Sequence, residues 1–221
     1  MNRAAACTLC AEISGTGGTN LYHQLRSPGA PDSRIVLESS GFVAMPSLGH
    51  LVDGYMILCS RDHVPSIGAS LLHRPGDELV EFVANVRSRL ERAFGRDIVL
   101  FEHGCGKDSP QLGCGVYHAH LHMVPSALDF SIDRRVAQLH WNPCTLRDLQ
   151  ELGQSPAGYL FYTDPSGNGF ATTETNSVPS QFFRRIIAEV ALKSAAWNWR
   201  EFPMADRVAA AVQSIGSTAM S

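Results

Sequence analysis

The sequence lacks a strong excess of charge of either sign and has no long apolar run. Its 221 residues carry 18 Lys and Arg against 21 Asp and Glu, which gives a net charge of -3. This near balance argues against bulk electrostatic capture of nucleic acid or of an anionic membrane. Apolar runs such as residues 55–59 are far shorter than the ~20 residues that cross a bilayer. The N-terminal residues contain no apolar signal-peptide core. We therefore expect a cytoplasmic protein with neither nucleic acid nor membrane as a partner.

Cysteine is also scarce, with six residues spread over the chain. In a cytoplasmic protein of this size, six scattered cysteines do not predict a disulfide framework. Only Cys7 and Cys10 have the spacing of a chelating pair. Taken alone, the pair fits a redox motif, half of a metal site or two small buried residues.

The first two thirds of the chain predict an α+β fold. Residues 14–33 are rich in Gly, Ser, Thr and Pro and predict a loop. Apolar residues at helical spacing predict a long helix over residues 77–94, with Gly95 directly after it. The expected strands are 34–38, 42–45, 55–59, 97–101 and 116–124. This order predicts an antiparallel sheet of about five strands with a long crossover helix.

The last third predicts an extension of the same unit. Its expected elements are a helical patch at residues 145–152, a strand at 158–162, a turn at 164–169 and helices near 180–192 and 204–212. These elements are mixed α/β and lack a core of their own. We therefore divide the chain into an N-terminal ligand segment and loop (1–33), a core (34–130) and a C-terminal extension packed on the core (131–221).

Three histidines alternate with apolar residues at 118–122, which is the most informative pattern in the chain. In a strand, alternate side chains share a face, so His118, His120 and His122 would lie together. Three buried rings are costly to satisfy on a purely structural face, because each has two nitrogens that need partners. The pattern favours a chemical or metal-binding role over a structural one.

This pattern resembles the motif of the histidine triad superfamily, His-φ-His-φ-His-φ-φ with φ hydrophobic, at all seven positions from 118 to 124. Residues 54–63 are similar to the family's glycine, apolar strand, basic residue and histidine segment. The resemblance covers about residues 7–125. It implies a sheet of about five antiparallel strands with a long helix, in agreement with the order of elements above.

The resemblance implies a nucleotide hydrolase acting at the α-phosphorus of a nucleoside phosphate derivative. His120 would be the nucleophile that forms a covalent nucleotidyl intermediate, and His122 would contact the phosphate and the leaving oxygen. An imidazole has a pKa of about 6.5, so a useful neutral fraction exists near pH 7. The resemblance also implies a nucleotide or nucleotide conjugate as the ligand and allows a homodimer.

The loop before the triad departs from the common hydrolase pattern. Cys114 and Gly115 replace a Gln and a Ser whose side chains contact the phosphate in that branch. Gly-Cys before the histidines, and His103 in a segment similar to Phe-Glu-Asn-x-Gly, resemble the galactose-1-phosphate uridylyltransferases. Ser47 stands near the position of the acidic residue that binds ribose in many members. Two alternatives therefore stay open: a nucleotidyltransferase or phosphorylase, and an inactive zinc-stabilised nucleotide-binding module.

Four residues match the structural zinc site of the zinc-bearing members. Two thiolates need two further ligands to complete a tetrahedral site. The resemblance implies Cys7, Cys10, His63 and His118 as these ligands, with His50 as a less favoured alternative to His63. Four protein ligands leave no open position, so the zinc would be structural.

The C-terminal extension offers further candidates for substrate binding. Gln181 and Arg184 lie where a helix is expected to begin, and arginines bind phosphates well. A solvated basic helix face is the alternative. Trp197 and Trp199 are most simply a hydrophobic seal between the extension and the sheet. With His103, Cys114, Gly115 and Ser47, Gln181 and Arg184 complete the expected substrate-binding set.

Overall fold

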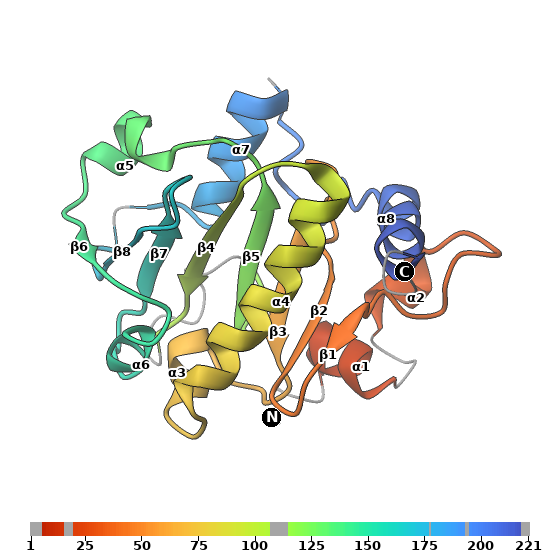
Figure 1. The fold of residues 1–221 in the computed structure, drawn as a ribbon, viewed down its shortest axis with the longest axis horizontal. Helices are drawn as coiled ribbons and strands as arrows, with labels where there is room; N and C mark the ends of the chain where they lie inside the picture. Colours follow the sequence, from red (N-terminus) through yellow and green to blue (C-terminus); the bar gives the residue numbers. More distant parts are fainter. Residues whose placement is uncertain (1–5, 16–19, 107–114, 177, 193–194, 218–221) are drawn as a thin grey trace.

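One antiparallel sheet of eight strands organises the chain in the computed structural model (Figure 1), which describes residues 6–15, 20–106, 115–176, 178–192 and 195–217. The strand order is β1-β2-β3-β5-β4-β7-β8-β6. The five strands expected in the core are present, and three strands from the extension lengthen the sheet beyond the predicted five. The bounds are β1 Leu37–Glu38, β2 Phe42–Pro46, β3 Met56–Ser60, β4 Ile98–Gly104, β5 His120–Pro125, β6 Asn142–Pro143, β7 Tyr159–Thr163 and β8 Gly169–Thr172.

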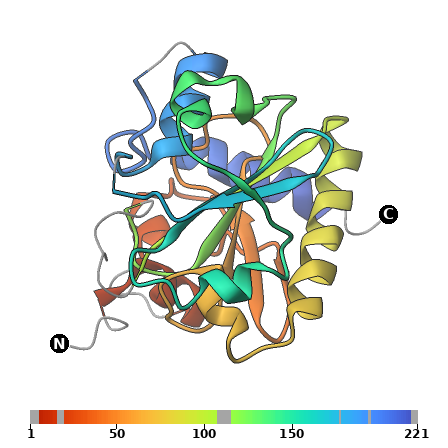
Figure 2. The ribbon, with the colours of Figure 1, turned by 90° about the vertical axis from the view of Figure 1, so that its left-hand side faces the viewer.

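Helices cover both faces of the sheet (Figure 2). The long helix α4 packs on one face, where Leu79, Val83 and Val86 meet Leu100 and Leu121 of the strands. Helix α7 and the short helix α1 lie against the other face, which carries the histidines. The bounds are α1 Thr8–Ser14, α2 Leu21–Leu25, α3 Ile67–Leu71, α4 Gly76–Phe94, the 3-10 helix η2 Phe130–Ile132, α5 Arg134–Ala137, α6 Leu149–Leu152, α7 Phe182–Leu192 and α8 Ala205–Ser217.

The observed elements differ from the sequence predictions mainly in the loops. Helix α4 agrees with the prediction to within one residue, but β1 covers only the last two residues of the strand expected at 34–38. Helix α2 lies inside the loop expected at 14–33. The strand expected from residue 116 begins at His120, because residues 115–118 form a bend. His118 therefore lies just before β5 rather than in it.

The extension and the core share one hydrophobic cluster. Strand β7 pairs with β4, with Phe101 opposite Tyr162. The Phe183 ring of α7 lies 5.1 Å from the ring of Phe101 and 5.0 Å from the ring of Phe130. These contacts hold α7 over the strands that carry His120 and His122.

Glu102 of β4 is a buried carboxyl group that holds the start of α3. Its Oε1 accepts a hydrogen bond from the backbone N–H of Ile67 at 2.8 Å, and the Tyr159 hydroxyl donates to its Oε2. Burial raises the pKa of Glu102 to about 8, although both hydrogen bonds oppose the shift. The group is therefore neutral in the folded chain at pH 7.

Glu102 should make the free energy of unfolding fall as the pH rises from about 4.5 to about 8. In this window the folded chain keeps a proton that an unfolded carboxyl group has lost, since the unfolded pKa is about 4.3. The decline is at most about 1.4 kcal/mol per pH unit. Glu102→Gln keeps a neutral side chain, so it should flatten the decline. Urea unfolding of both proteins across this pH window measures the difference, and equal slopes would contradict it.

None of the helices in the described part of the chain combines the length and the apolar character needed to cross a membrane.

Candidate functional site

The His120 ring is oriented by a hydrogen bond from one of its two nitrogens to the backbone. Its Nδ1 donates a hydrogen bond to the backbone carbonyl of His118 at 2.6 Å. Because Nδ1 carries the hydrogen, the neutral ring has its lone pair on Nε2. Burial lowers the pKa of His120 below its usual value, and the bond to the His118 carbonyl partly offsets this shift. The ring is therefore neutral, with a basic nitrogen available for attack.

His122 is fixed by two aromatic neighbours. The Tyr55 hydroxyl lies 2.9 Å from its Nδ1, and the ring of Phe101 stacks on it at 4.3 Å with an interplanar angle of 15°. Its Nε2 has no hydrogen-bond partner among the described residues. Burial, and after it the neighbouring His120, hold the pKa of His122 well below 6.5. The His120 and His122 ring centroids are 4.9 Å apart, so both rings can reach one small ligand.

A narrow cavity opens beside these two rings. Its free volume is about 40 Å³, which is room for a few water molecules or one small polar group. His120 is 7% exposed, so the ring is nearly buried without being sealed from the cavity. The lining residues include the expected His120, His122, Ser47 and Arg184, together with Thr8, Arg34, Ile57 and Trp199.

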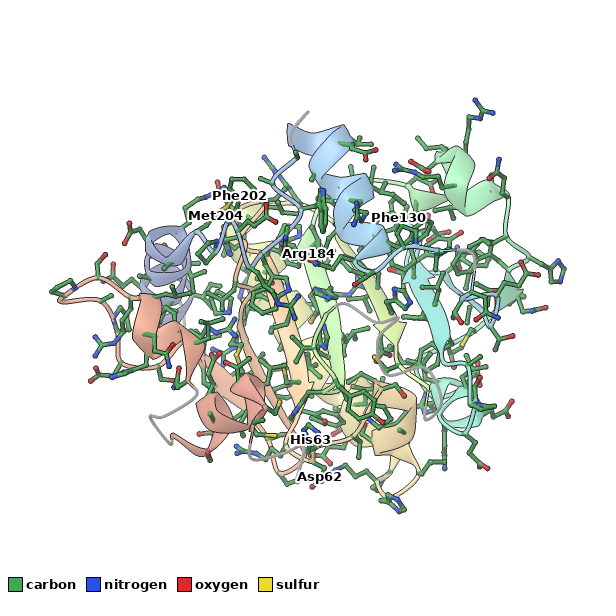
Figure 3. The ribbon with its side chains drawn as sticks, turned by 180° about the vertical axis from the view of Figure 1, so that it is seen from behind. Asp62, His63, Phe130, Arg184, Phe202 and Met204 are labelled. Atoms are coloured by element: carbon green, nitrogen blue, oxygen red, sulfur yellow. The ribbon has the colours of Figure 1, made fainter. Side chains whose placement is uncertain are left out.

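A second cluster, of two cysteines and two histidines, lies at the other end of the triad. The ligand atoms of Cys7, Cys10, His63 and His118 all lie within 4.8 Å of one another. The two cysteines come from the start of α1, while His63 follows β3 and His118 precedes β5. In Figure 3, His63 lies near the end of the sheet away from Arg184. His50, the alternative ligand, is outside this cluster.

The geometry of this cluster fits a zinc ion. Cys10 Sγ lies 3.2 Å from His63 Nδ1 and 3.4 Å from His118 Nδ1, and Cys7 Sγ lies 3.5 Å from the same His118 nitrogen. Zn–S bonds of ~2.3 Å and Zn–N bonds of ~2.0–2.1 Å in a tetrahedron separate S and N by about 3.5 Å. His118 Nε2 donates to the Ser60 carbonyl at 2.8 Å, which leaves Nδ1 free to bind metal. The cluster can hold a metal ion with two sulfur and two nitrogen ligands.

Burial sets the protonation of these ligands. It lowers the pKa of His118 to about 4, so the imidazole is neutral, as a metal ligand must be. Burial, and after it the charge of Cys7, raise the pKa of Cys10 to about 12. Two thiolates at this position need a cation to balance their charge, which a divalent metal would supply.

A wider hollow of about 400 Å³ borders the metal cluster, with Cys7 and His63 among its lining residues. It shares Thr8, Val116 and Trp199 with the cavity. Gly115 lines it at a φ of +87°, a conformation that favours glycine, and its carbonyl accepts a hydrogen bond from Arg200. Trp199 is 9% exposed, which agrees with its expected role as a seal, and it also forms a wall of both spaces.

Two other expected substrate-binding residues, His103 and Gln181, do not line the cavity. His103 is buried on β4, with neither ring nitrogen partnered among the described residues, and it does not line the cavity. Burial, and after it the charge of His120 on the neighbouring strand β5, lowers the pKa of His103 to about 4. Gln181 is buried at a φ of +60° before α7 and also lies outside the lining. Cys114 lies outside the described residues.

Sequence reasoning did not identify Tyr55, Arg34 or Thr8 as part of the site. Arg34 is buried and paired with Glu12 through two contacts of 2.5 and 3.0 Å. Thr8 Oγ1 accepts the backbone N–H of Leu21 at 3.1 Å. One signal was available for Tyr55, because a buried tyrosine in an apolar strand needs a partner for its hydroxyl. No motif in the sequence singled out Arg34, at the start of an expected strand, or Thr8.

No family model and no curated protein matches this chain. Solved structures similar to it include a HIT family protein from Bacillus anthracis, with 18% identity, a TM-score of 0.41 and coverage of 67% of this chain and 93% of that one. A hypothetical histidine triad nucleotide-binding protein from Sulfolobus tokodaii has 20% identity, a TM-score of 0.38 and coverage of 54% and 68%. A Zn-bound histidine triad family protein from Mycobacterium smegmatis has 19% identity, a TM-score of 0.35 and coverage of 69% and 94%. These distant likenesses assign neither substrate nor reaction to this chain.

Proposed function

We propose that this chain is a histidine triad protein that hydrolyses a nucleoside phosphate derivative at its α-phosphorus, through a nucleotidyl intermediate on His120. The observation that carries the proposal is the fixed tautomer of His120. Its Nδ1 is committed to the His118 carbonyl, so Nε2 is the nucleophilic nitrogen, and the ring borders a cavity. A neutral, oriented imidazole beside a space the size of a phosphoryl group suits attack at phosphorus.

The reaction proceeds in two displacements. In the first, the Nε2 lone pair of His120 forms a P–N bond while the bond from phosphorus to the leaving group breaks, and the leaving group takes up a proton from solvent. In the second, water attacks the same phosphorus, the P–N bond breaks, and the proton of the water is released. Splitting one difficult displacement into two in this way is the general advantage of covalent catalysis.

His122 is the proposed hydrogen-bond donor to the leaving group. We assign the Tyr55 hydroxyl as the donor to Nδ1, which places the hydrogen of the neutral ring on Nε2, the nitrogen that has no partner among the described residues. This N–H can donate to a phosphoryl or leaving-group oxygen as negative charge develops there. The stacked Phe101 ring keeps the donor in place.

The ligand extends beyond the cavity. A free volume of about 40 Å³ accepts a phosphoryl group but no nucleoside, and the adjoining hollow of about 400 Å³ provides further room. Zinc bound by Cys7, Cys10, His63 and His118 would be structural, linking α1 to the segments that precede β5 and follow β3. In that role it would fix the backbone carbonyl of His118, which orients His120.

Incubation with adenosine 5′-phosphoramidate and its guanosine, cytidine and uridine counterparts tests the proposal. We expect intact-mass spectrometry of the acid-free, rapidly quenched protein to show a nucleoside-monophosphate adduct that maps to His120, together with released monophosphate. Retained adduct that is discharged only by added phosphate or a sugar phosphate would favour transfer over hydrolysis. Binding of the nucleotides with no adduct and no turnover would identify an inactive module and overturn the proposal.

A further inference from the structure

Arg184 is a buried cation in the wall of the His120 cavity. It extends from α7 towards the face of the sheet that carries the histidines (Figure 3), and the whole residue is 1% exposed. Its guanidinium carbon lies 5.2 Å above the ring of Tyr55, the residue whose hydroxyl contacts His122. The charge therefore lies close to the pair of rings assigned to the chemistry.

The charge of Arg184 is not balanced within the described protein. Arg34, the other cation that lines the cavity, is paired with the buried carboxylate of Glu12. Arg184 has no carboxylate within ion-pair distance among the described residues. Because a buried charge without a counter-charge is costly, a site of this kind favours an anionic ligand.

Part of the guanidinium is also free to bind. Its Nε donates to the Trp197 carbonyl at 3.1 Å and its Nη2 to the Gly49 carbonyl at 2.9 Å, while Nη1 lies 3.5 Å from Ser47 Oγ. These contacts use at most three of the five N–H groups. They also fix the plane of the group, which lowers the entropy cost of binding a ligand. The remaining donors form a planar fork, which suits the paired oxygens of a phosphoryl group.

We propose that Arg184 binds the non-bridging oxygens of the phosphoryl group that His120 attacks and neutralises the charge on them during attack. This inference rests on the proposed function. It makes the C-terminal extension part of the catalytic site, because α7 delivers this cation to the wall of the cavity. Gly115 has no side chain to offer, and Thr8 and Ser47 already bond the protein backbone.

Equilibrium binding separates recognition of phosphate from recognition of the nucleoside. AMP, GMP, CMP and UMP, each compared with its nucleoside, are titrated by calorimetry into the wild type and into Arg184→Gln and Arg184→Lys. We expect Arg184→Gln to weaken binding of the preferred monophosphate by about 10- to 100-fold, since one charged hydrogen-bonding group is lost. Nucleoside affinity should stay unchanged, and Arg184→Lys should restore part of the loss.

Arg185→Gln is the matched control. Arg185 is the next residue of the same helix, its guanidinium stacks on Trp197 at 3.4 Å, and it does not line the cavity. This variant should bind monophosphates as the wild type does, and urea unfolding reports on the folding of all variants.

Three results would overturn the inference: wild-type monophosphate affinity in Arg184→Gln, an equal loss of nucleoside and monophosphate binding in that variant, or no preference of the wild type for monophosphate over nucleoside. Monophosphate binding requires no chemistry, so its outcome is independent of adduct formation. An Arg184-dependent preference without any adduct would end the role of His120 as nucleophile and leave only the binding of phosphate by Arg184. An adduct on His120, together with wild-type monophosphate binding by Arg184→Gln, would instead support His120 as nucleophile and end the proposed role of Arg184.

Discussion

His120→Ala is expected to lower turnover of the preferred nucleoside phosphoramidate by at least about four orders of magnitude and to abolish the adduct. The substitution removes the nucleophile, and binding together with the remaining donors provides only the residual rate. Steady-state turnover and intact mass measure the two effects. The metal content should be that of the wild type, because His120 is not among the clustered ligands. Substantial turnover by a folded His120→Ala protein would remove the basis of the proposed reaction.

His122→Ala is the companion variant, and it should fail in a different way. If the His122 N–H stabilises the charge that develops on the leaving group, its loss should slow cleavage of an amidate or alkyl ester by about 10²- to 10⁴-fold. An ester with p-nitrophenol as the leaving group needs no protonation, so most of the rate should return with it. An equal loss for both leaving groups would assign His122 to phosphate binding instead.

Loss of one metal ligand is expected to have the largest effect on stability. Cys10→Ser should remove most of the bound zinc and lower the unfolding temperature by at least about 8 °C, because structural zinc contributes directly to folding and 1 kcal/mol corresponds to ~2–4 °C in a chain of this size. Metal analysis and thermal unfolding, each with and without chelator, measure the effect. The wild type should carry one zinc per chain. Chelator should lower its unfolding temperature by about as much as the Cys10→Ser substitution does.

Cys144→Ser is the matched control for Cys10→Ser. Cys144 is a buried thiol of the extension, outside the metal cluster, and its Sγ contacts only the carbonyl of Thr145 among the described polar partners. The same change of sulfur to oxygen at this position should leave the zinc content unchanged and cost much less stability. Equal zinc content in the two variants would show that Cys10 is not a ligand.

Local patterns predicted those parts of the fold that depend on neighbours in sequence. The spacing of apolar residues identified α4, and alternation placed His120 and His122 on one face of β5. The number of strands was underestimated because β7 joins the sheet by pairing with β4, which lies more than fifty residues earlier in the chain, and β8 and β6 follow beyond β7. Helix α1 was not predicted, since seven residues are too few to display a helical period.

The metal cluster of the candidate site could be predicted from the sequence, whereas the walls of the cavity could not. The resemblance indicated the four clustered ligands, and the structure places all of them together. The walls of the cavity come from segments that are distant in sequence, among them Arg34 and Trp199, and no local pattern records such proximity. Arg184 was expected to bind substrate, but its unbalanced charge became visible only when its surroundings were known.

The position of β7 along β4 limits how two molecules of this protein can associate. Strand β4 is enclosed between β5 and β7, so a second copy cannot add a strand to it. The outermost strands, β1 and β6, are two residues long, and β6 ends at Pro143, which has no N–H to donate. Short borders of this kind discourage intermolecular strand addition. If the protein forms a homodimer, we therefore expect its two subunits to meet through helices or loops rather than through one continuous sheet.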